Sequence, residues 1–460
     1  MPQQSLIIKH YYKATLVNNV TNCRLILTTS YVTRCEGVSL TLRRKHSLGN
    51  QQIPVSKQKR VALGNPEINS LTLSQKRDIL ALDTDNNTLK FPTIWLRDNC
   101  QCPACFQRHS QSRTIDWGKF DFGVKPLSAK LVESELTIEW SDNHRSNFTL
   151  DWLIERSFTE EKRKLFRNKI YRFERTTWGA DEFGKYLKKF DYKSVLNEDS
   201  TLLNWLESLT KYGVAIVTNV PAKNNSNKIL TERVAFTRRT HYGEEFTVIA
   251  KDGTTNVAYL SSTLPLHTDL PYYHYAPGAN LLHCLVQSQG KGGESQLADG
   301  FHVGNYLKLH EPESYKILTK TLVDWSDVGH ENGDHFHSLH QAPVLCEDEF
   351  GDLVRVNFSQ PQRDSHFNAP LEQVILWYEA VGLFTKLLYS PENNVTFKLA
   401  EGDILTFDNL RLVHGRSAYA DTTGRERLLI GCYLDWDEIY SRIRVLRKQL
   451  KRSKEMNIGQ

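Results

Sequence analysis

Three side chains of types that bind transition metals stand out in the second half of the chain. His267 and Asp269 are one residue apart in the segment LPLHTDLPYYH, and His414 ends the segment LTFDNLRLVH. Because side chains alternate between the two faces of an extended backbone, His267 and Asp269 point to the same side. Two histidines and one carboxylate on one face of an iron ion leave its other positions open for a cosubstrate and dioxygen, as in non-haem oxygenases. The pattern predicts an iron(II) site with these three ligands.

A suitably placed arginine supports this hypothesis. Arg427 lies 13 residues after His414, near the start of the segment RERLLIGCYLDWD, which is expected to be the next strand. A guanidinium group can bind a carboxylate through two parallel hydrogen bonds. 2-Oxoglutarate offers such a carboxylate at one end and a metal-chelating keto acid at the other. Arg427 is therefore predicted to anchor 2-oxoglutarate. The alternative, that all four side chains are ordinary core polar residues, explains their combination less well.

A second group of metal-binding types lies nearer the N-terminus. Cys100, Cys102 and Cys105 place three thiols within six residues, whereas the other five cysteines are scattered. Three thiolates and one imidazole suit a tetrahedral zinc ion, and by spacing alone His109 is the nearest candidate for the fourth ligand. The alternatives are buried free cysteines or a redox cluster. The number and spacing of the cysteines are typical of a protein from a reducing compartment and not of a secreted disulfide framework.

The elements that must position these residues suggest two folded parts. Residues 76–165 contain short alternating segments such as AKLVESELTIEW and predict a small β-rich domain. Residues 166–205 are polar and charged, and we expect a linker with helical pieces. Residues 206–460 contain many short strands broken by Gly, Asn and Pro, with helices between some of them. The expected fold is mainly β with helices (α+β), a double-stranded β-helix or jelly-roll core plus the small N-terminal domain.

The C-terminal segment predicts an amphipathic helix. Ile439, Ile443, Leu446 and Leu450 follow the spacing of one helical stripe. Such a stripe either packs on the chain's own barrel, which is the commoner case, or forms a dimerisation helix.

Charge is distributed unevenly along the 460 residues. The first 60 residues hold ten Lys or Arg and one acid, a net charge of +9, so the remainder carries −4 of the total of +5. A mildly acidic body argues against a broad nucleic-acid-binding face. The basic leader, residues 1–75, resembles a mitochondrial transit segment or is a disordered extension, so both a mitochondrial and a cytoplasmic location stay open. No run approaches the ~18 apolar residues of a membrane span.

A string of ordered motifs identifies a family. The segments include FPTIWLRDNCQCPAC, NVAYLSSTLPLHTDLPYYHYAPGANLLHC, GGESQLADGF, VRVNFSQPQRD, FDNLRLVHGR and GCYLDWDEIYSRIRVLR. Over about residues 85 to 450 the chain resembles the γ-butyrobetaine dioxygenase and trimethyllysine dioxygenase family, the hydroxylases of carnitine biosynthesis. The resemblance implies that His267, Asp269 and His414 bind iron and that Arg427 binds 2-oxoglutarate. It also implies that His144, rather than His109, completes the zinc site.

The resemblance also implies a substrate site. It assigns the trimethylammonium group to an aromatic cage of Tyr242, Phe246, Tyr259 and Tyr433, and the substrate carboxylate to Asn256 and Ser359. Phe246 stands where a Trp is expected, and Ser359 where an Asn is expected. Tyr272 and Tyr273 lie close to the metal ligands in sequence but are not among the implied cage positions. Both departures fall at the substrate and none at iron.

The expected activity is therefore hydroxylation of γ-butyrobetaine to L-carnitine, dependent on Fe(II), 2-oxoglutarate, dioxygen and ascorbate, in a zinc-containing homodimer. Trimethyllysine or a related trimethylammonium acid is the alternative substrate. A catalytically silent, zinc-bearing interaction protein is the alternative from another class. The last segment, DWDEIYSRIRVLR, is more similar to the butyrobetaine enzyme than to the trimethyllysine enzyme.

Overall fold

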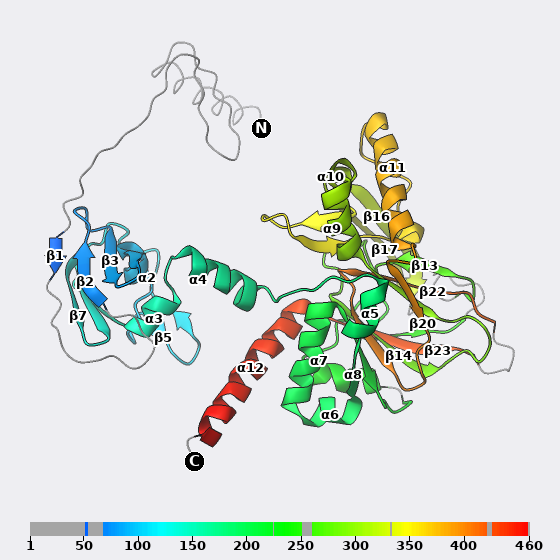
Figure 1. Ribbon diagram of the computed structural model, residues 1–460, viewed down its shortest axis with the longest axis horizontal. Helices are drawn as coiled ribbons and strands as arrows, with labels where there is room; N and C mark the ends of the chain where they lie inside the picture. The colour runs from blue at the N-terminus through cyan, green and yellow to red at the C-terminus, as the bar shows by residue number, and fades with distance from the viewer. Residues whose placement is uncertain are drawn as a thin grey trace, which may run out of the picture. The chain divides into compact units, whose positions relative to one another are not determined.

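The chain divides into two compact units in the computed structural model, which describes residues 51–53, 68–223, 225–250, 260–331, 334–420 and 426–458. Unit 1 is Met1–Leu165 and unit 2 is Phe166–Gln460 (Figure 1). Most of the expected leader, residues 1–75, lies outside the described residues. Its last part was assigned wrongly, because Ile68–Leu73 forms a strand with three buried residues in the unit 1 sheet.

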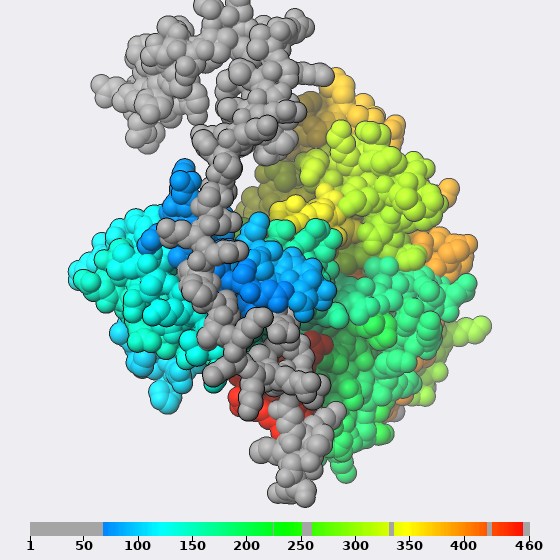
Figure 2. All heavy atoms as spheres, turned by 60° about the vertical axis from the view of Figure 1, so that its left-hand side comes forward, coloured from blue at the N-terminus to red at the C-terminus, as the bar shows by residue number. Residues whose placement is uncertain are grey.

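Unit 1 is built from two antiparallel sheets. The first has the order β1-β2-β3-β4 and the second the order β7-β8-β9. The strands are β1 Gln51–Ile53, β2 Ile68–Leu73, β3 Ile79–Thr84, β4 Thr88–Pro92, the short pair β5 Phe106–Gln107 and β6 Ser112–Arg113, then β7 Pro126–Val132, β8 Glu135–Trp140 and β9 Arg145–Thr149. The helices are α2 Thr93–Asp98, α3 Leu150–Glu155 and α4 Glu160–Leu165. Alternating side chains of both sheets, such as Leu80, Leu82, Leu136 and Ile138, form one core. Blue and cyan atoms of this unit are visible on the face drawn in Figure 2.

Unit 2 contains two larger sheets. The six-stranded sheet has the order β10-β11-β21-β14-β23-β12, and the four-stranded sheet has the order β13-β22-β15-β20. The first comprises β10 Lys188–Asp191, β11 Val214–Thr218, β12 Glu245–Val248, β14 Ala279–Val286, β21 Ile404–Asp408 and β23 Leu428–Leu434. The second comprises β13 Leu264–His267, β15 Ser295–Asp299, β20 Asn394–Phe397 and β22 Leu412–Arg416. Two hairpins, β16 Val323–Glu331 with β17 Asp334–Ala342 and β18 Leu345–Glu347 with β19 Leu353–Val356, complete the strands.

The two sheets of unit 2 face each other across a shared core. Ile216, Leu405 and Leu429 of the six-stranded sheet pack with Leu297 and Leu412 of the four-stranded sheet. Neighbouring strands in both sheets are antiparallel, except that β10 and β11 are parallel. Two facing sheets of this kind form a jelly roll, which confirms the predicted mainly β fold with helices.

Unit 2 also contains eight α-helices among the described residues, most of which pack outside the two sheets. They are α5 Ala180–Tyr186, α6 Tyr192–Asn197, α7 Asp199–Tyr212, α8 Ser226–Glu232, α9 Gly300–His310, α10 Pro312–Lys320, α11 Leu371–Leu388 and α12 Trp436–Ile458, with a π-helix η1 at Phe166–Tyr171 and a 3₁₀ turn η3 at Gln360–Gln362. Figure 1 shows α6, α7, α8 and α12 gathered on one side of unit 2 and α9, α10 and α11 at the other end. No helix among the described residues is long and apolar enough to cross a membrane.

The segment predicted to be a linker, residues 166–205, is part of the fold. It forms α5, β10, α6 and the start of α7, and β10 pairs with β11 from Lys188↔Ala215 to Asp191↔Thr218. Its polar residues are the solvent faces of amphipathic elements, while Val195, Leu202 and Trp205 are fully buried. The C-terminal stripe also packs within its own unit, since Ile439, Ile443 and Leu446 belong to the core on the outer side of the six-stranded sheet.

Candidate metal centre, cosubstrate site and substrate site

The two predicted histidine ligands face each other across neighbouring strands. His267 is the last residue of β13 and pairs in register with His414 of β22. Their ring centroids are 4.2 Å apart, and each side chain is only 11% exposed. Directly paired residues of two antiparallel strands project from the same face of a sheet, so strand register alone brings the two imidazoles together.

Asp269 joins the pair two residues after His267. Its Oδ1 atom lies 3.2 Å from His267 Nε2 and 3.5 Å from His414 Nε2. The possible ligand atoms of all three residues lie within 4.8 Å of one another. The chain turns away directly afterwards, where Leu270 adopts a φ of 54°. The structure therefore assembles the three residues that the sequence predicted as iron ligands.

The protonation states of this cluster suit a divalent cation. Nδ1 of His267 donates a hydrogen bond to the Pro265 carbonyl at 2.8 Å, which leaves Nε2 directed at Asp269 as an acceptor. Burial and the neighbouring His267 lower the pKa of His414 to about 3, so this ring is neutral at pH 7. Burial favours a neutral Asp269, but His414 and His267 outweigh it and hold its pKa below the usual value. One carboxylate and two imidazoles whose Nε2 atoms face it form a donor set that fits iron(II).

Two asparagines that the sequence analysis missed hold Asp269 in place. Asn280 Nδ2 donates to Asp269 Oδ2 at 2.6 Å. Asn409 accepts from the Asp269 backbone N–H at 2.7 Å and donates to its carbonyl at 3.0 Å. Both asparagines are at most 1% exposed. Both occur in the motifs that carry the family resemblance, PGANLLHC and FDNLRLVHG, so a polar residue next to buried strands was the available signal.

Arg427 is a buried residue of unit 2 and lies close to a second arginine, Arg416. It is 4% exposed and precedes β23 directly. Its guanidinium carbon lies 5.6 Å from the Tyr419 ring, and that of Arg416 lies 4.7 Å from the same ring. Burial and the nearby Arg427 lower the pKa of Arg416 to about 10. Arg416 follows His414 by two residues on β22 and so points to the same face. Two neighbouring guanidinium groups, one of them on the same strand face as His414, fit a dianionic cosubstrate such as 2-oxoglutarate.

Three of the implied cage residues come together. Phe246 stacks on Tyr433 with centroids 5.1 Å apart, and Tyr242 lies 6.1 Å from Phe246. Phe246 pairs in register with Gly431 on β23, where a Cβ atom would lie 2.1 Å from the phenyl Cζ. A glycine at this position is what allows the phenyl ring to lie on the strand. The Tyr433 hydroxyl also donates to Asp269 Oδ2 at 3.0 Å, so the cage directly adjoins the metal cluster.

The other implied substrate residues are placed only in part. Asn256 and Tyr259 lie outside the described residues. Ser359 is 1% exposed, and its hydroxyl donates to Gln362 Oε1 at 2.9 Å. It is linked to the metal cluster through its neighbour Phe358, whose carbonyl accepts from the Thr268 backbone N–H at 2.7 Å. Ser359 thus lies near the metal cluster, and its hydroxyl is hydrogen-bonded to the side chain of Gln362.

The cysteine cluster in unit 1 closes around a histidine. His144 Nε2 lies 3.2, 3.6 and 3.5 Å from the sulfur atoms of Cys100, Cys102 and Cys105. These four ligand atoms lie within 4.8 Å of one another, whereas His109 is exposed and outside the group. Burial and the neighbouring Cys100 raise the pKa of Cys105 to about 12. Three sulfur atoms and one imidazole nitrogen grouped this closely form a donor set that fits tetrahedral zinc.

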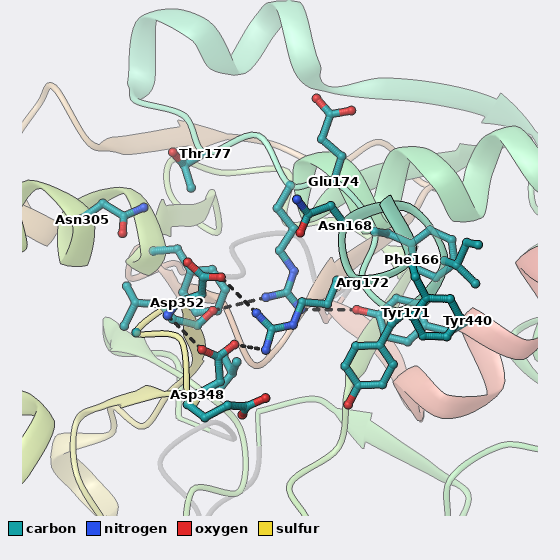
Figure 3. Close-up of a pocket in the computed structure, with 18 of the residues that line it drawn as sticks. Phe166, Asn168, Tyr171, Arg172, Glu174, Thr177, Asn305, Asp348, Asp352 and Tyr440 are labelled. Atoms are coloured by element: carbon teal, nitrogen blue, oxygen red, sulfur yellow. Dashed lines mark hydrogen bonds and ion pairs between the residues drawn. The ribbon is translucent and has the colours of Figure 1, made fainter. Parts of the chain in front are cut away.

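A separate cavity of about 1070 Å³ lies elsewhere in unit 2. Its walls come from η1 and the segment after it, the β18–β19 turn, α9 and α12. Arg172 forms ion pairs with Asp348 and Asp352 inside it (Figure 3). None of the predicted metal, cosubstrate or substrate residues lines this cavity. It is therefore not part of the candidate site.

A jelly roll that brings together two histidines from neighbouring strands and one carboxylate defines the class of non-haem iron oxygenases. Residues 172–433 match the model of the taurine catabolism dioxygenase TauD, TfdA family, and residues 71–154 match the γ-butyrobetaine hydroxylase-like N-terminal model. The chain belongs to the TauD, TfdA dioxygenase family and is an enzyme dependent on Fe(II) and 2-oxoglutarate.

The relatives cover most of the chain. Human γ-butyrobetaine dioxygenase is 35% identical over 80% of this chain and 94% of its own length. γ-Butyrobetaine dioxygenase of Pseudomonas sp. (strain AK-1) is 30% identical over 79% and 92%. Bovine mitochondrial trimethyllysine dioxygenase is 29% identical over 81% and 86%. Among solved structures, a taurine dioxygenase from Burkholderia xenovorans aligns with a TM-score of 0.41 and 16% identity over 54% of this chain and 87% of that chain.

Proposed function

We propose that the chain hydroxylates γ-butyrobetaine, with His267, Asp269 and His414 as the iron ligands and Arg427 as the anchor of 2-oxoglutarate. The observation that carries this proposal is the contact between Tyr433 and Asp269, because it joins an aromatic cage to a 2-His-1-carboxylate cluster. Iron(II) held by these ligands supplies the activation of dioxygen, coupled to the decarboxylation of 2-oxoglutarate to succinate.

The protein's own residues position the reactants. Arg427 binds the far carboxylate of 2-oxoglutarate, and Arg416 adds positive charge beside it. Asn280 and Tyr433 donate to one oxygen of Asp269, so its other oxygen stays directed at the histidines. No side-chain base is needed for hydroxylation, since the protein's part is to place the substrate carbon and to bind the charged ends.

The aromatic cage suits a quaternary ammonium group, which cannot donate hydrogen bonds. Tyr242, Phe246 and Tyr433 offer ring faces, and we also assign Tyr259 to the cage. Phe in place of Trp at position 246 is expected to weaken the cation–π contact by about 0.5 kcal/mol. We assign the substrate carboxylate to Asn256 and Ser359.

The second candidate substrate is trimethyllysine, on which other relatives act by their names. The higher identity to γ-butyrobetaine dioxygenases favours γ-butyrobetaine. The test is to incubate the purified chain with Fe(II), 2-oxoglutarate and ascorbate and to follow succinate with each substrate. Faster succinate formation with γ-butyrobetaine supports the proposal. Faster succinate formation with trimethyllysine would show that the chain is a trimethyllysine hydroxylase instead. Absence of turnover with both substrates would favour a catalytically silent interaction protein.

Four further assignments belong to the same proposal. Zinc bound by Cys100, Cys102, Cys105 and His144 stabilises unit 1, because all four tetrahedral positions are filled by protein. Ascorbate keeps the iron reduced. The chain is a homodimer, as the family resemblance implies, which light scattering after gel filtration would test. Its location is mitochondrial or cytoplasmic, which a fluorescent fusion carrying residues 1–75 would decide.

A further inference from the structure

Aromatic side chains extend beyond the implied cage. The His241 ring lies 3.9 Å from the Tyr242 ring, 4.1 Å from Phe336 and 6.0 Å from Tyr272, measured between centroids. Tyr273 donates or accepts a hydrogen bond at His241 Nδ1 at 2.7 Å. Burial lowers the pKa of His241 to about 4, so this ring carries no charge at pH 7. The neutral aromatic cluster therefore reaches from the cage to the β16–β17 hairpin.

The hairpin has distinct inner and outer faces. Val328 and Leu339 on the outer face are 63% and 61% exposed. Trp325 on the inner face is fully buried, and Phe336 on that face contacts His241. Because strand side chains alternate, Asp327 shares the inner face with Trp325. The hairpin thus directs one carboxylate toward the aromatic cluster.

Tyr272 marks where this carboxylate points. The Tyr272 side chain is 1% exposed, and the Asp327 carboxylate and Tyr242 lie beside its hydroxyl. Asp327 and Tyr272 interact electrostatically at this hydroxyl, so the carboxylate contacts the aromatic cluster there. Tyr272 therefore lies between the cage residue Tyr242 and Asp327, at the end of the cage.

Asp327 has one polar side-chain neighbour with a measured hydrogen bond. Gln362 donates to Asp327 Oδ2 at 3.5 Å and accepts from Ser359 at 2.9 Å. No Lys, Arg or His forms an ion pair with Asp327 among the described residues. A half-buried carboxylate beside uncharged rings and without a protein cation favours a cationic ligand.

We propose that Asp327 is the anionic element of the substrate site and determines its specificity for a positively charged substrate. Its charge acts on the ammonium group across the Tyr242 and Tyr272 rings, in addition to the attraction of the rings themselves. This inference rests on the proposed function and names a residue that the family resemblance did not supply.

The test compares a cation with its neutral isostere. γ-Butyrobetaine and 5,5-dimethylhexanoate have the same shape, but the second has a tert-butyl group in place of trimethylammonium. Asp327→Asn is expected to raise the KM for γ-butyrobetaine on the order of tenfold, as loss of one unit charge in a partly screened site predicts. The binding of the isostere and the KM for 2-oxoglutarate should change by less than about twofold. Asp327→Glu should retain the preference for the cation.

Asp324→Asn is the matched control. Asp324 lies on the same strand but on the outer face, where it accepts from Gln341 at 3.0 Å. Equal effects of Asp327→Asn on cation and isostere, or no effect on either, would overturn the inference. Wild-type protein that does not turn over γ-butyrobetaine would contradict the proposed function instead. In that case the affinity for tetramethylammonium chloride, measured by calorimetry, still tests the role of Asp327. Asp327→Asn must weaken this affinity and Asp324→Asn must not.

Discussion

Asp269 uses its two carboxylate oxygens for different purposes. Oδ1 faces the two histidines, whereas Oδ2 accepts hydrogen bonds from Asn280 and Tyr433. Hydrogen bonds to the second oxygen fix the orientation of the first, which is how residues behind metal ligands commonly tune affinity. At the residue scale, we therefore propose two separable roles for Tyr433: its hydroxyl orients the proposed iron ligand Asp269, and its ring belongs to the proposed cage.

Tyr433→Phe separates these roles. The ring stays in place, but Asp269 loses one donor, so we expect affinity for iron(II) to fall about tenfold while the KM for γ-butyrobetaine changes less. The measurement is succinate formation as a function of iron(II) concentration, followed by substrate titration at saturating iron. Asn280→Ala, which removes the other donor, should also weaken iron binding. Unchanged iron affinity in both variants would show that Asp269 does not depend on these donors.

His414→Ala tests the ligand assignment itself. Removal of one of three protein ligands should abolish substrate-dependent succinate formation, because the remaining pair binds iron too weakly to hold it in the site. His241→Ala is a useful comparison, since His241 is buried among the aromatic rings but outside the metal cluster. This comparison variant should keep iron binding, measured by metal content after dialysis. Full activity of His414→Ala would refute the assignment.

At the scale of elements, the strand pairings explain why the site could be predicted only in part. His267 and Asp269 were recognisable from their two-residue spacing, but their meeting with His414 depends on the β13–β22 register. Asn409 escaped notice because its contacts with Asp269 span 140 residues of sequence. The mistaken linker has a similar cause: short amphipathic helices and a four-residue strand carry too few apolar residues to stand out from a polar segment.

The pairing of β12 with β23 yields a prediction for the cage. Gly431→Ala would place a Cβ within 2.1 Å of the Phe246 ring, so the ring must leave the strand. The KM for γ-butyrobetaine is expected to rise at least tenfold, with a loss of about 1–3 kcal/mol in the free energy of unfolding. Gly382→Ala is the matched control, because a Cβ at this position of α11 meets no atom within 4 Å. That variant should be stabilised by up to about 1 kcal/mol. Similar KM values for both variants would exclude a fixed Phe246 position.

At the scale of the whole molecule, the two units have independent cores and different proposed metals. The unit 1 core contains only residues of the first 165 positions, and the three cores of unit 2 contain none of them. Separate cores predict separate unfolding transitions. The cysteine cluster connects the end of α2 with the turn before β9, so loss of its metal should affect unit 1 first.

Zinc removal from the full chain tests this division. His144→Ala should lower the zinc content and shift one calorimetric transition to lower temperature, because structural zinc contributes directly to folding free energy. The second transition should keep its midpoint, since the cores of unit 2 contain none of the four ligands. His109→Ala provides the control, as His109 is the exposed histidine that spacing alone would have chosen. It should retain one zinc per chain and both transitions. A shift of both transitions in His144→Ala would mean that the two units unfold together. Loss of zinc in His109→Ala would show that His109, and not His144, is the fourth zinc ligand.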